Sequence, residues 1–261
     1  MKSSQPIITG STLISCVLLF GINALLAENY LAIRYDMDIT FMPAGGNNPA
    51  QITGINHITI TNNWVRPLED IYLHNNSNGY FSPEDKNTPH TVIGEVKSDH
   101  LDEVLERDAI SMRITLDPPV PPGESLEVEV PFVTHIARNQ NPFAPTMGSN
   151  EDTTIYNLIF FYPVLEYFHD DGWHIEAHQG KADPYSNMSE YQVTFTFPVG
   201  YQVGTSAHLV TADTLENEMA RWRLYYPKAI SFSAVLSEKF KFKREEIEND
   251  LHRSQWKKED H

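Results

Sequence analysis

The sequence is almost free of cysteine. Its single cysteine, Cys16, lies in an apolar stretch near the start of the chain, so the rest of the sequence contains no thiol. A disulfide and a cysteine nucleophile are therefore excluded in that remainder. At 261 residues, the chain is long enough to bury a core that needs no disulfides.

Basic residues are also scarce. The chain has 19 lysines and arginines against 35 aspartates and glutamates, for a formal net charge of −16. A negative field repels phosphate backbones, so we expect no nucleic-acid partner. Helical patterns are equally few, with a short helical turn expected at Ser98–Arg107 and no long amphipathic helix before Lys241. This argues against Rossmann and barrel enzymes, which alternate strands with helices.

Several catalytic motifs are missing as well. The sequence has no Gly-x-Ser-x-Gly elbow, no glycine-rich phosphate loop and no His-Glu-x-x-His zinc motif. A pair of carboxylates, as in glycosidases, is not excluded among so many acidic residues. We therefore expect no cofactor and no complete catalytic centre, and activity of the chain on its own stays an open question.

Residues 1–27 have the pattern of an export signal. Lys2 precedes the uncharged apolar run from Ile7 to Ala27, and the small residues Ala24 and Ala27 suit cleavage. The pattern predicts a signal peptide and a periplasmic or secreted protein. Two alternatives remain: an uncleaved membrane anchor, because about 20 apolar residues span a bilayer, and lipidation at the lipobox-like sequence ending in Cys16. Membrane contact is expected only through this segment.

Residues 28–240 are dominated by strand-like alternation. Ile33, Tyr35, Met37, Ile39 and Phe41 alternate with polar residues, which is typical of a half-buried strand. The same alternation recurs in residues 110–116, 126–132, 193–197, 222–226 and 230–236. About ten such strands, separated by turn clusters, predict an all-β antiparallel sandwich.

Two further segments carry predictions of their own. Asp117–Gly123 is rich in proline, and the strands before and after it are expected to pair with each other. The tail 241–261 is charged almost throughout, with apolar residues at roughly helical spacing. It is expected to be a frayed end or a helix that seeks a partner.

Candidate metal ligands lie at His174, Glu176 and His178. In an extended chain these side chains share one face, and their Cβ atoms repeat about every 7 Å, which is loose for a single metal ion. Two of them with a residue from a neighbouring strand would fit better. The alternative interpretation is a polar strand edge that faces solvent.

One aromatic stretch resembles a known family. Residues Phe160–Trp173 carry a Phe-Phe-Tyr-Pro sequence followed by Asp-Asp-Gly-Trp, and they resemble the N-terminal β-sandwich domain of aminopeptidase N-like zinc metallopeptidases (gluzincins). Further segments resemble the same domain in the same order. They are Gln51–Gly54, Thr59–Asn63, Leu68–His74, Pro121–Ser125, Asp183–Tyr185, Glu190–Pro198, Tyr201–Thr205 and Ile230–Ala234.

The resemblance implies a saddle-shaped β-sandwich over residues 31–240. In that family the zinc ligands and the glutamate base lie on helices of a following domain, and this sequence has no counterpart of them. The family's sandwich also presents a polar residue to the substrate just before the aromatic-Tyr-Pro sequence. The matching substrate-facing positions here are Asn157, Phe160, Phe161 and Tyr162, and Phe160 cannot accept a hydrogen bond.

These observations predict a non-catalytic, exported binding or scaffold module with a protein or peptide partner, such as a separate catalytic domain. The first alternative is the N-terminal part of a split or truncated zinc aminopeptidase. The second is a metal-dependent enzyme that uses His174, Glu176 and His178. Because the family's neighbouring domain is missing, we also expect an exposed apolar patch at Phe160–Phe168, covered by the tail or by another chain.

Overall fold

The computed structural model describes residues 30–46, 48–78, 90–106, 110–136, 147–149, 154–175 and 185–241. The predicted signal segment, residues 1–27, lies outside the described residues, and so does the predicted tail beyond Lys241. Within the described ranges, no helix is long and apolar enough to cross a membrane.

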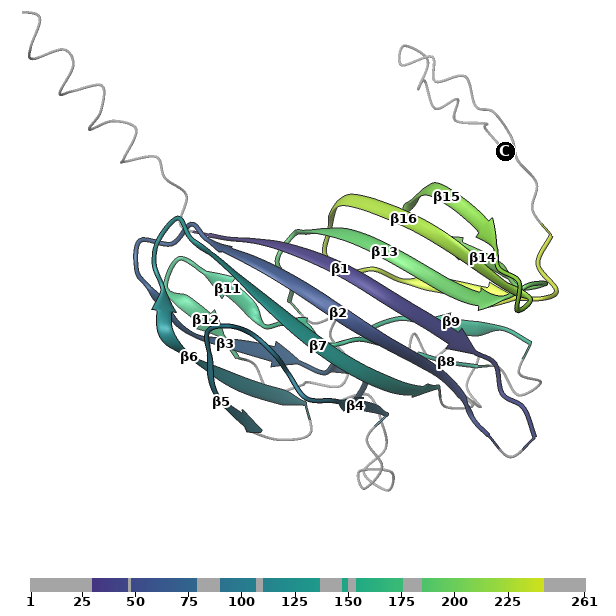
Figure 1. The fold of residues 1–261 in the computed structure, drawn as a ribbon, viewed down its shortest axis with the longest axis horizontal. Helices are drawn as coiled ribbons and strands as arrows, with labels where there is room; N and C mark the ends of the chain where they lie inside the picture. The colour runs from purple at the N-terminus through teal and green to yellow at the C-terminus, as the bar shows by residue number, and fades with distance from the viewer. Residues whose placement is uncertain are drawn as a thin grey trace, which may run out of the picture.

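The predicted alternation produces one large, strongly twisted sheet (Figure 1). It has seven strands in the order β15-β16-β13-β1-β2-β7-β4. Their bounds are β1 Leu31–Met42, β2 Ala50–Asn62, β4 Thr91–Ile93, β7 Ser125–Ile136, β13 Ser189–Pro198, β15 His208–Thr214 and β16 Met219–Ala229. Strand β1 pairs with β2 over its whole length, and β2 pairs with β7 almost as far.

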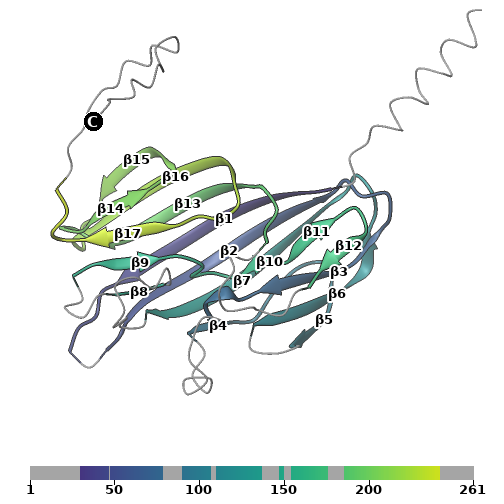
Figure 2. The same cartoon turned by 180° about the vertical axis from the view of Figure 1, so that it is seen from behind.

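Two smaller sheets and a hairpin form a second layer on one face of the large sheet. From behind, β9 and β17 lie towards one end of the large sheet and β3, β6 and β10 towards the other (Figure 2). The first small sheet contains β3 Leu68–His74, β5 Leu101–Glu106, β6 Ser111–Val120 and β10 Val164–Leu165. The second contains β8 Gly148–Ser149, β9 Tyr156–Leu158, β14 Gln202–Thr205 and β17 Ala234–Ser237. The hairpin joins β11 Tyr167–His169 and β12 Gly172–His174.

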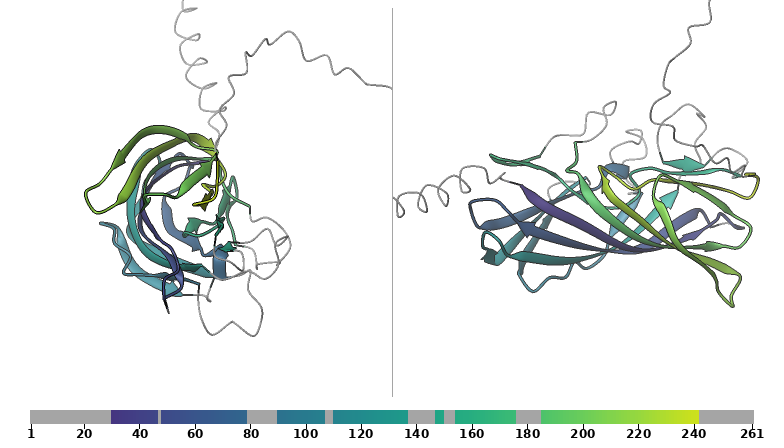
Figure 3. Two further views of the ribbon diagram at one scale, coloured as in Figure 1. Left: turned by 90° about the vertical axis from the view of Figure 1, so that its right-hand side faces the viewer. Right: turned by 90° about the horizontal axis from the view of Figure 1, so that it is seen from above.

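The core lies between these layers, and the large sheet curves around the inner strands (Figure 3). The odd-numbered residues of β1 from Leu31 to Phe41 are buried, as the alternation predicts, because that face of the strand meets the second layer. Gly54 of β2 lies on the same face. A methyl group there would lie 2.8 Å from Ile39 Cγ2 and 2.9 Å from Phe132 Cζ, so only glycine fits. The predicted all-β sandwich is confirmed.

Two local predictions were wrong. Where a helical turn was expected at Ser98–Arg107, a single turn at residues 98–101 leads into the edge strand β5, Leu101–Glu106, because pairing with β6 outweighs local preference, and Arg107 lies outside the described residues. The strands on either side of Asp117–Gly123 do not pair. Strand β6 runs on to Val120 within a small sheet, whereas β7 starts at Ser125 in the large one, so this connection passes between layers.

The sheet is also not wholly antiparallel. Strands β1 and β13 pair in parallel, from Arg34 opposite Glu190 to Thr40 opposite Thr196. The last strand starts later than expected, at Ala234 rather than Ile230, because residues 230–233 form the connection that leads into the second layer.

Candidate functional site

The aromatic segment, residues 160–168, joins the two small sheets. Strand β9 ends at Leu158 in one of them, and β10 begins at Val164 in the other. Three hydrogen bonds tie the connection to the neighbouring strands β7, β2 and β1 of the large sheet. They join Thr134 Oγ1 to the Phe161 carbonyl (2.6 Å), Asn56 Nδ2 to the Pro163 carbonyl (2.9 Å) and the Leu165 N–H to the Tyr35 hydroxyl oxygen (3.0 Å).

Most rings of the aromatic segment are buried by the domain itself. Phe161 and Tyr162 are 0% exposed, and Phe168 is 2% exposed. The expectation that Phe160–Phe168 forms an apolar patch covered by the tail or by another chain is therefore wrong for these rings. Their burial comes from packing between the large sheet and the small sheets. Phe160 and Tyr167 are half-buried.

Three buried tyrosines fix the centre of this region. The rings of Tyr35 and Tyr191 stack with centroids 4.9 Å apart, and Tyr162 meets each of them edge-on at 6.4 Å. The Tyr162 hydroxyl oxygen accepts a hydrogen bond from the Phe232 N–H at 2.7 Å, which also holds the connection before β17. Burial raises the pKa of all three hydroxyls above the ordinary tyrosine value.

Because the pKa values of these three tyrosines are raised, the protein is expected to lose stability in alkaline solution. Unfolded tyrosines ionise near pH 10. Because the folded pKa values of Tyr35, Tyr162 and Tyr191 lie above that value, their contribution is fully present below about pH 10 and declines as the pH rises further. Urea unfolding followed by circular dichroism at about pH 8 and about pH 11 should show the decline. A Tyr35→Phe variant should show a shallower one, and an equal slope in both proteins would contradict the assignment.

Phe160 is the exceptional residue of the segment. Its φ angle is 53°, in the left-handed region that a bulky aromatic residue rarely adopts. Glu218, at 58°, is the other non-glycine residue with positive φ in the described ranges, and it lies in the turn between β15 and β16. Of the predicted substrate-facing residues, Phe161 and Tyr162 are buried, while Asn157 and Phe160 are half-buried. Only the latter two reach the surface.

Sequence patterns did not reveal a buried polar pair beside this segment. The Nδ1 atom of His74 lies 2.7 Å from the Glu166 carboxylate, with side chains 8% and 6% exposed. The Ser111 hydroxyl donates to the same carboxylate oxygen at 3.4 Å. Glu166 thus attaches the aromatic segment to β3 through His74 and to β6 through Ser111. No periodicity signals such a pair, because its members are far apart in the sequence.

A chain of buried hydroxyl groups was also not predicted. Hydrogen bonds link Ser77 to Thr91, Thr91 to Thr134 (2.7 Å), and Thr134 to the Phe161 carbonyl (2.6 Å). Each of the three hydroxyl-bearing residues is at most 1% exposed. The backbone conformation next to Phe160 is therefore set from inside the protein.

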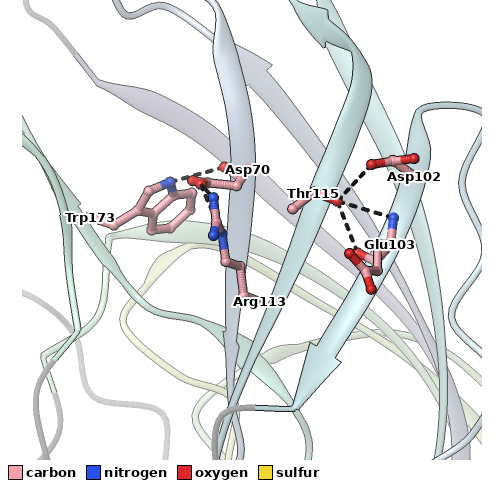
Figure 4. A network of polar contacts seen from close by, with 6 residues as sticks. All are labelled: Asp70, Asp102, Glu103, Arg113, Thr115 and Trp173. Atoms are coloured by element: carbon pink, nitrogen blue, oxygen red, sulfur yellow. Dashed lines mark hydrogen bonds and ion pairs between the residues drawn. The ribbon is translucent and has the colours of Figure 1, made fainter.

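The β11–β12 hairpin is held firmly against the small sheet. Trp173 Nε1 donates to the Asp70 carbonyl at 3.1 Å, and the Asp70 carboxylate accepts two hydrogen bonds from Arg113 (Figure 4). The ring of Phe168 contacts that of Trp173 at 5.0 Å. Asn187 binds the Phe168 backbone twice, at 2.8 Å each, so both strands of the hairpin are anchored.

The other face of the hairpin is polar and open. His174 Nε2 lies 2.8 Å from Asp171 Oδ1, and His169 Nδ1 lies 3.7 Å from the same atom. The hydrogen bond to His174 lowers the pKa of Asp171 below its ordinary value. Of the predicted metal ligands, His174 belongs to this cluster, whereas Glu176 and His178 lie outside the described residues. His169 was not predicted, although its place across the turn follows from the hairpin register.

The outer face of the large sheet carries a polar groove of about 620 Å³. Charged side chains line it, among them Arg34, Asp36, Glu127 and Glu129. The Lys97 ammonium lies 3.1 Å from the Glu129 carboxylate at its edge, where the Lys97 side chain is 61% exposed and the Glu129 side chain 32% exposed. Such alternating charges are typical of a solvated sheet face.

Comparison with known proteins shows where this fold occurs elsewhere. No family model matches the chain, and no curated protein matches it. Among solved structures, the M1 zinc metallopeptidase from Deinococcus radiodurans matches with a TM-score of 0.51 and 14% identity, over 80% of this chain and 43% of that one. A variant of that enzyme gives the same score and identity, over 79% and 42%. A two-domain M1 zinc metallopeptidase variant bound to L-arginine matches with a TM-score of 0.50 and 16% identity, over 80% and 43%.

These likenesses show a shared fold. The chain spans less than half the length of the zinc metallopeptidases that it matches. The resemblance expected from Phe160–Trp173 is therefore confirmed for the fold.

Proposed function

We propose that the chain is a non-catalytic binding module that docks a protein partner at the surface around Phe160. The observation that carries the proposal is the φ angle of 53° at this residue. A left-handed conformation costs a bulky residue about 1–2 kcal/mol, and such strain is retained where the surroundings enforce it, often at binding sites. Here the hydrogen bond from the Thr134 hydroxyl to the Phe161 carbonyl holds the backbone that follows Phe160.

A second exposed apolar residue lies on the connection that packs against this segment. Ile230 is 55% exposed, and its carbonyl accepts a hydrogen bond from Tyr191. Phe161 and Phe232 meet edge-on at 6.3 Å, so the connections that carry Phe160 and Ile230 are packed together. We call Phe160 and Ile230 the docking pair. Apolar side chains that are partly exposed and held by a well-packed backbone are typical anchor residues of protein interfaces.

The occupant that we propose is the catalytic domain of a zinc peptidase supplied by a separate chain. The support is that M1 zinc metallopeptidases contain this fold as less than half of their length. The module is further proposed to be exported through residues 1–27, so the partner would share its compartment. The alternative, an N-terminal part of a split or truncated aminopeptidase, predicts the same contact, and it differs in requiring that the partner be inactive without this chain.

Two assays test the proposal. The purified chain alone should not hydrolyse leucine p-nitroanilide, because it has no His-Glu-x-x-His motif. Co-expression with the reading frames that flank its gene should yield a stoichiometric complex with a zinc-peptidase domain. Hydrolysis by that complex but not by the partner alone would favour the split enzyme, whereas equal hydrolysis by both would favour the non-catalytic module. Turnover by the chain alone, or the lack of any such complex, would contradict the proposal.

Variants of the docking pair should weaken the complex. Phe160→Ala and Ile230→Ala are each expected to lower the affinity at least about tenfold in isothermal titration, as anchor residues do. Val65→Ala is the matched control, because Val65 is 65% exposed and lies in the turn after β2. Equal affinity in all three variants would show that the partner binds elsewhere.

A further inference from the structure

The β11–β12 hairpin brings three potential metal ligands together on its open face. The ligand atoms of His169, Asp171 and His174 all lie within 4.8 Å of one another. We propose that they form a site for a divalent transition-metal ion such as Zn²⁺, bound through His169 Nδ1, an Asp171 carboxylate oxygen and His174 Nε2. This site is independent of the docking pair and of any peptidase activity.

The distances approach those of a tetrahedral ion, and the two exposed imidazoles must rotate to complete it, since the three ligand atoms lie within 4.8 Å of one another. Bonds of about 2.0–2.1 Å to zinc place two tetrahedral ligand atoms about 3.3 Å apart. The Asp171 oxygen now lies 2.8 Å from His174 and 3.7 Å from His169, on either side of that value. Rotation of exposed side chains is enough to equalise these distances. Three protein ligands leave a fourth position for water.

The register of the hairpin places the ligands of such a site on one face. Tyr167 is opposite His174 and His169 is opposite Gly172 in the register, so one face carries both imidazoles. The opposite face is fixed by Phe168 and Trp173. Gly172 has a φ angle of 121°, which suits glycine, and no atom lies within 4 Å of where its Cβ would be. Metal binding would therefore order few groups that are not already ordered, which favours affinity.

The ligand set also selects the class of metal. Imidazole nitrogens suit zinc, copper, nickel and cobalt, whereas calcium and magnesium prefer oxygen ligands alone. The exposed fractions of the three side chains, 57%, 74% and 41%, leave them accessible to an ion from solution. The site is thus expected to take up zinc without unfolding of the hairpin.

Zinc titration of the apo chain tests the site. Calorimetry with ZnCl₂ should give one equivalent per chain, and excess Mg²⁺ or Ca²⁺ should not compete. Replacing zinc by Co²⁺ should give the intense visible absorption of a tetrahedral complex. The His169→Ala and His174→Ala variants should each weaken zinc binding at least about tenfold, because each removes a direct ligand. Asp171→Asn should do the same.

Two further variants make the test decisive. His208→Ala is the matched control: His208 is an exposed histidine of β15 and should not change the affinity. His178→Ala tests the pairing of His174 with Glu176 and His178. If His178→Ala abolishes zinc binding and His169→Ala leaves it intact, the proposed ligand set is wrong. Zinc binding that survives in the His169→Ala/His174→Ala double variant would overturn the proposed ligand set as well. Circular dichroism should first show that each variant is folded.

Discussion

Replacing Glu166 by alanine is expected to lower the free energy of unfolding by about 3 kcal/mol, as removal of one member of a buried pair does. The Glu166 carboxylate is the acceptor for both His74, at 2.7 Å, and Ser111, at 3.4 Å. His74 Nε2 already has no hydrogen-bond partner among the described residues, so the loss of Glu166 would leave both ring nitrogens of a buried imidazole unpaired. Urea unfolding at neutral pH measures the change.

A second glutamate provides the control. Glu129 also lies near a basic group, the Lys97 ammonium at 3.1 Å, but this pair is much more accessible to water, with side chains 61% and 32% exposed. Glu129→Ala is therefore expected to cost less than about 1 kcal/mol. Glu166→Gln keeps an oxygen that can accept from His74, and it should cost about 1 kcal/mol. Similar losses for Glu166→Ala and Glu129→Ala would show that the buried pair contributes little.

Replacing Thr134 by valine is expected to lower the free energy of unfolding by about 2 kcal/mol, although the side chains have nearly the same shape. The change removes the donor to the Phe161 carbonyl and the partner of the Thr91 hydroxyl. Thr134 is 0% exposed, so water cannot replace either bond. The variant should also release the backbone beside Phe160, which hydrogen exchange of the Tyr162 amide would report.

Thr53 is the matched position for this change. It lies on the neighbouring strand β2, opposite Val133, and its side chain faces the outer side of the sheet. Thr53→Val should change the free energy of unfolding by no more than about 0.5 kcal/mol. A loss at Thr134 no larger than the one at Thr53 would contradict a structural role for the buried hydroxyl chain.

The long strands β1 and β7 of the large sheet could be predicted because each buries one face. The alternation from Ile33 to Phe41 and from Leu126 to Phe132 identifies β1 and β7 directly, since every second residue meets the core. Alternation does not say which sheet a strand joins. That is why β6 and β7 were wrongly expected to pair, and why the parallel neighbour of β1 was not foreseen.

The candidate sites were predicted less well, for a related reason. The aromatic segment was recognised from its resemblance to a known family, but Phe161 and Tyr162 face inward because the connection runs against the inner face of the large sheet. No local pattern encodes that path. His174 was identified as a candidate ligand, whereas His169 could be added only once the turn at Asp170 and Asp171 set the hairpin register.

The parallel pairing of β1 with β13 has a consequence for how the protein folds. Strand β1 ends at Met42 and β13 begins at Ser189, so the centre of the large sheet joins segments far apart in the chain. Contacts of such long sequence separation slow folding, because the loop must close before they form. Until β13 is available, β1 has one unpaired edge, which is a template for aggregation. A nascent chain would therefore depend on protection of that edge until β13, Ser189–Pro198, has been synthesised.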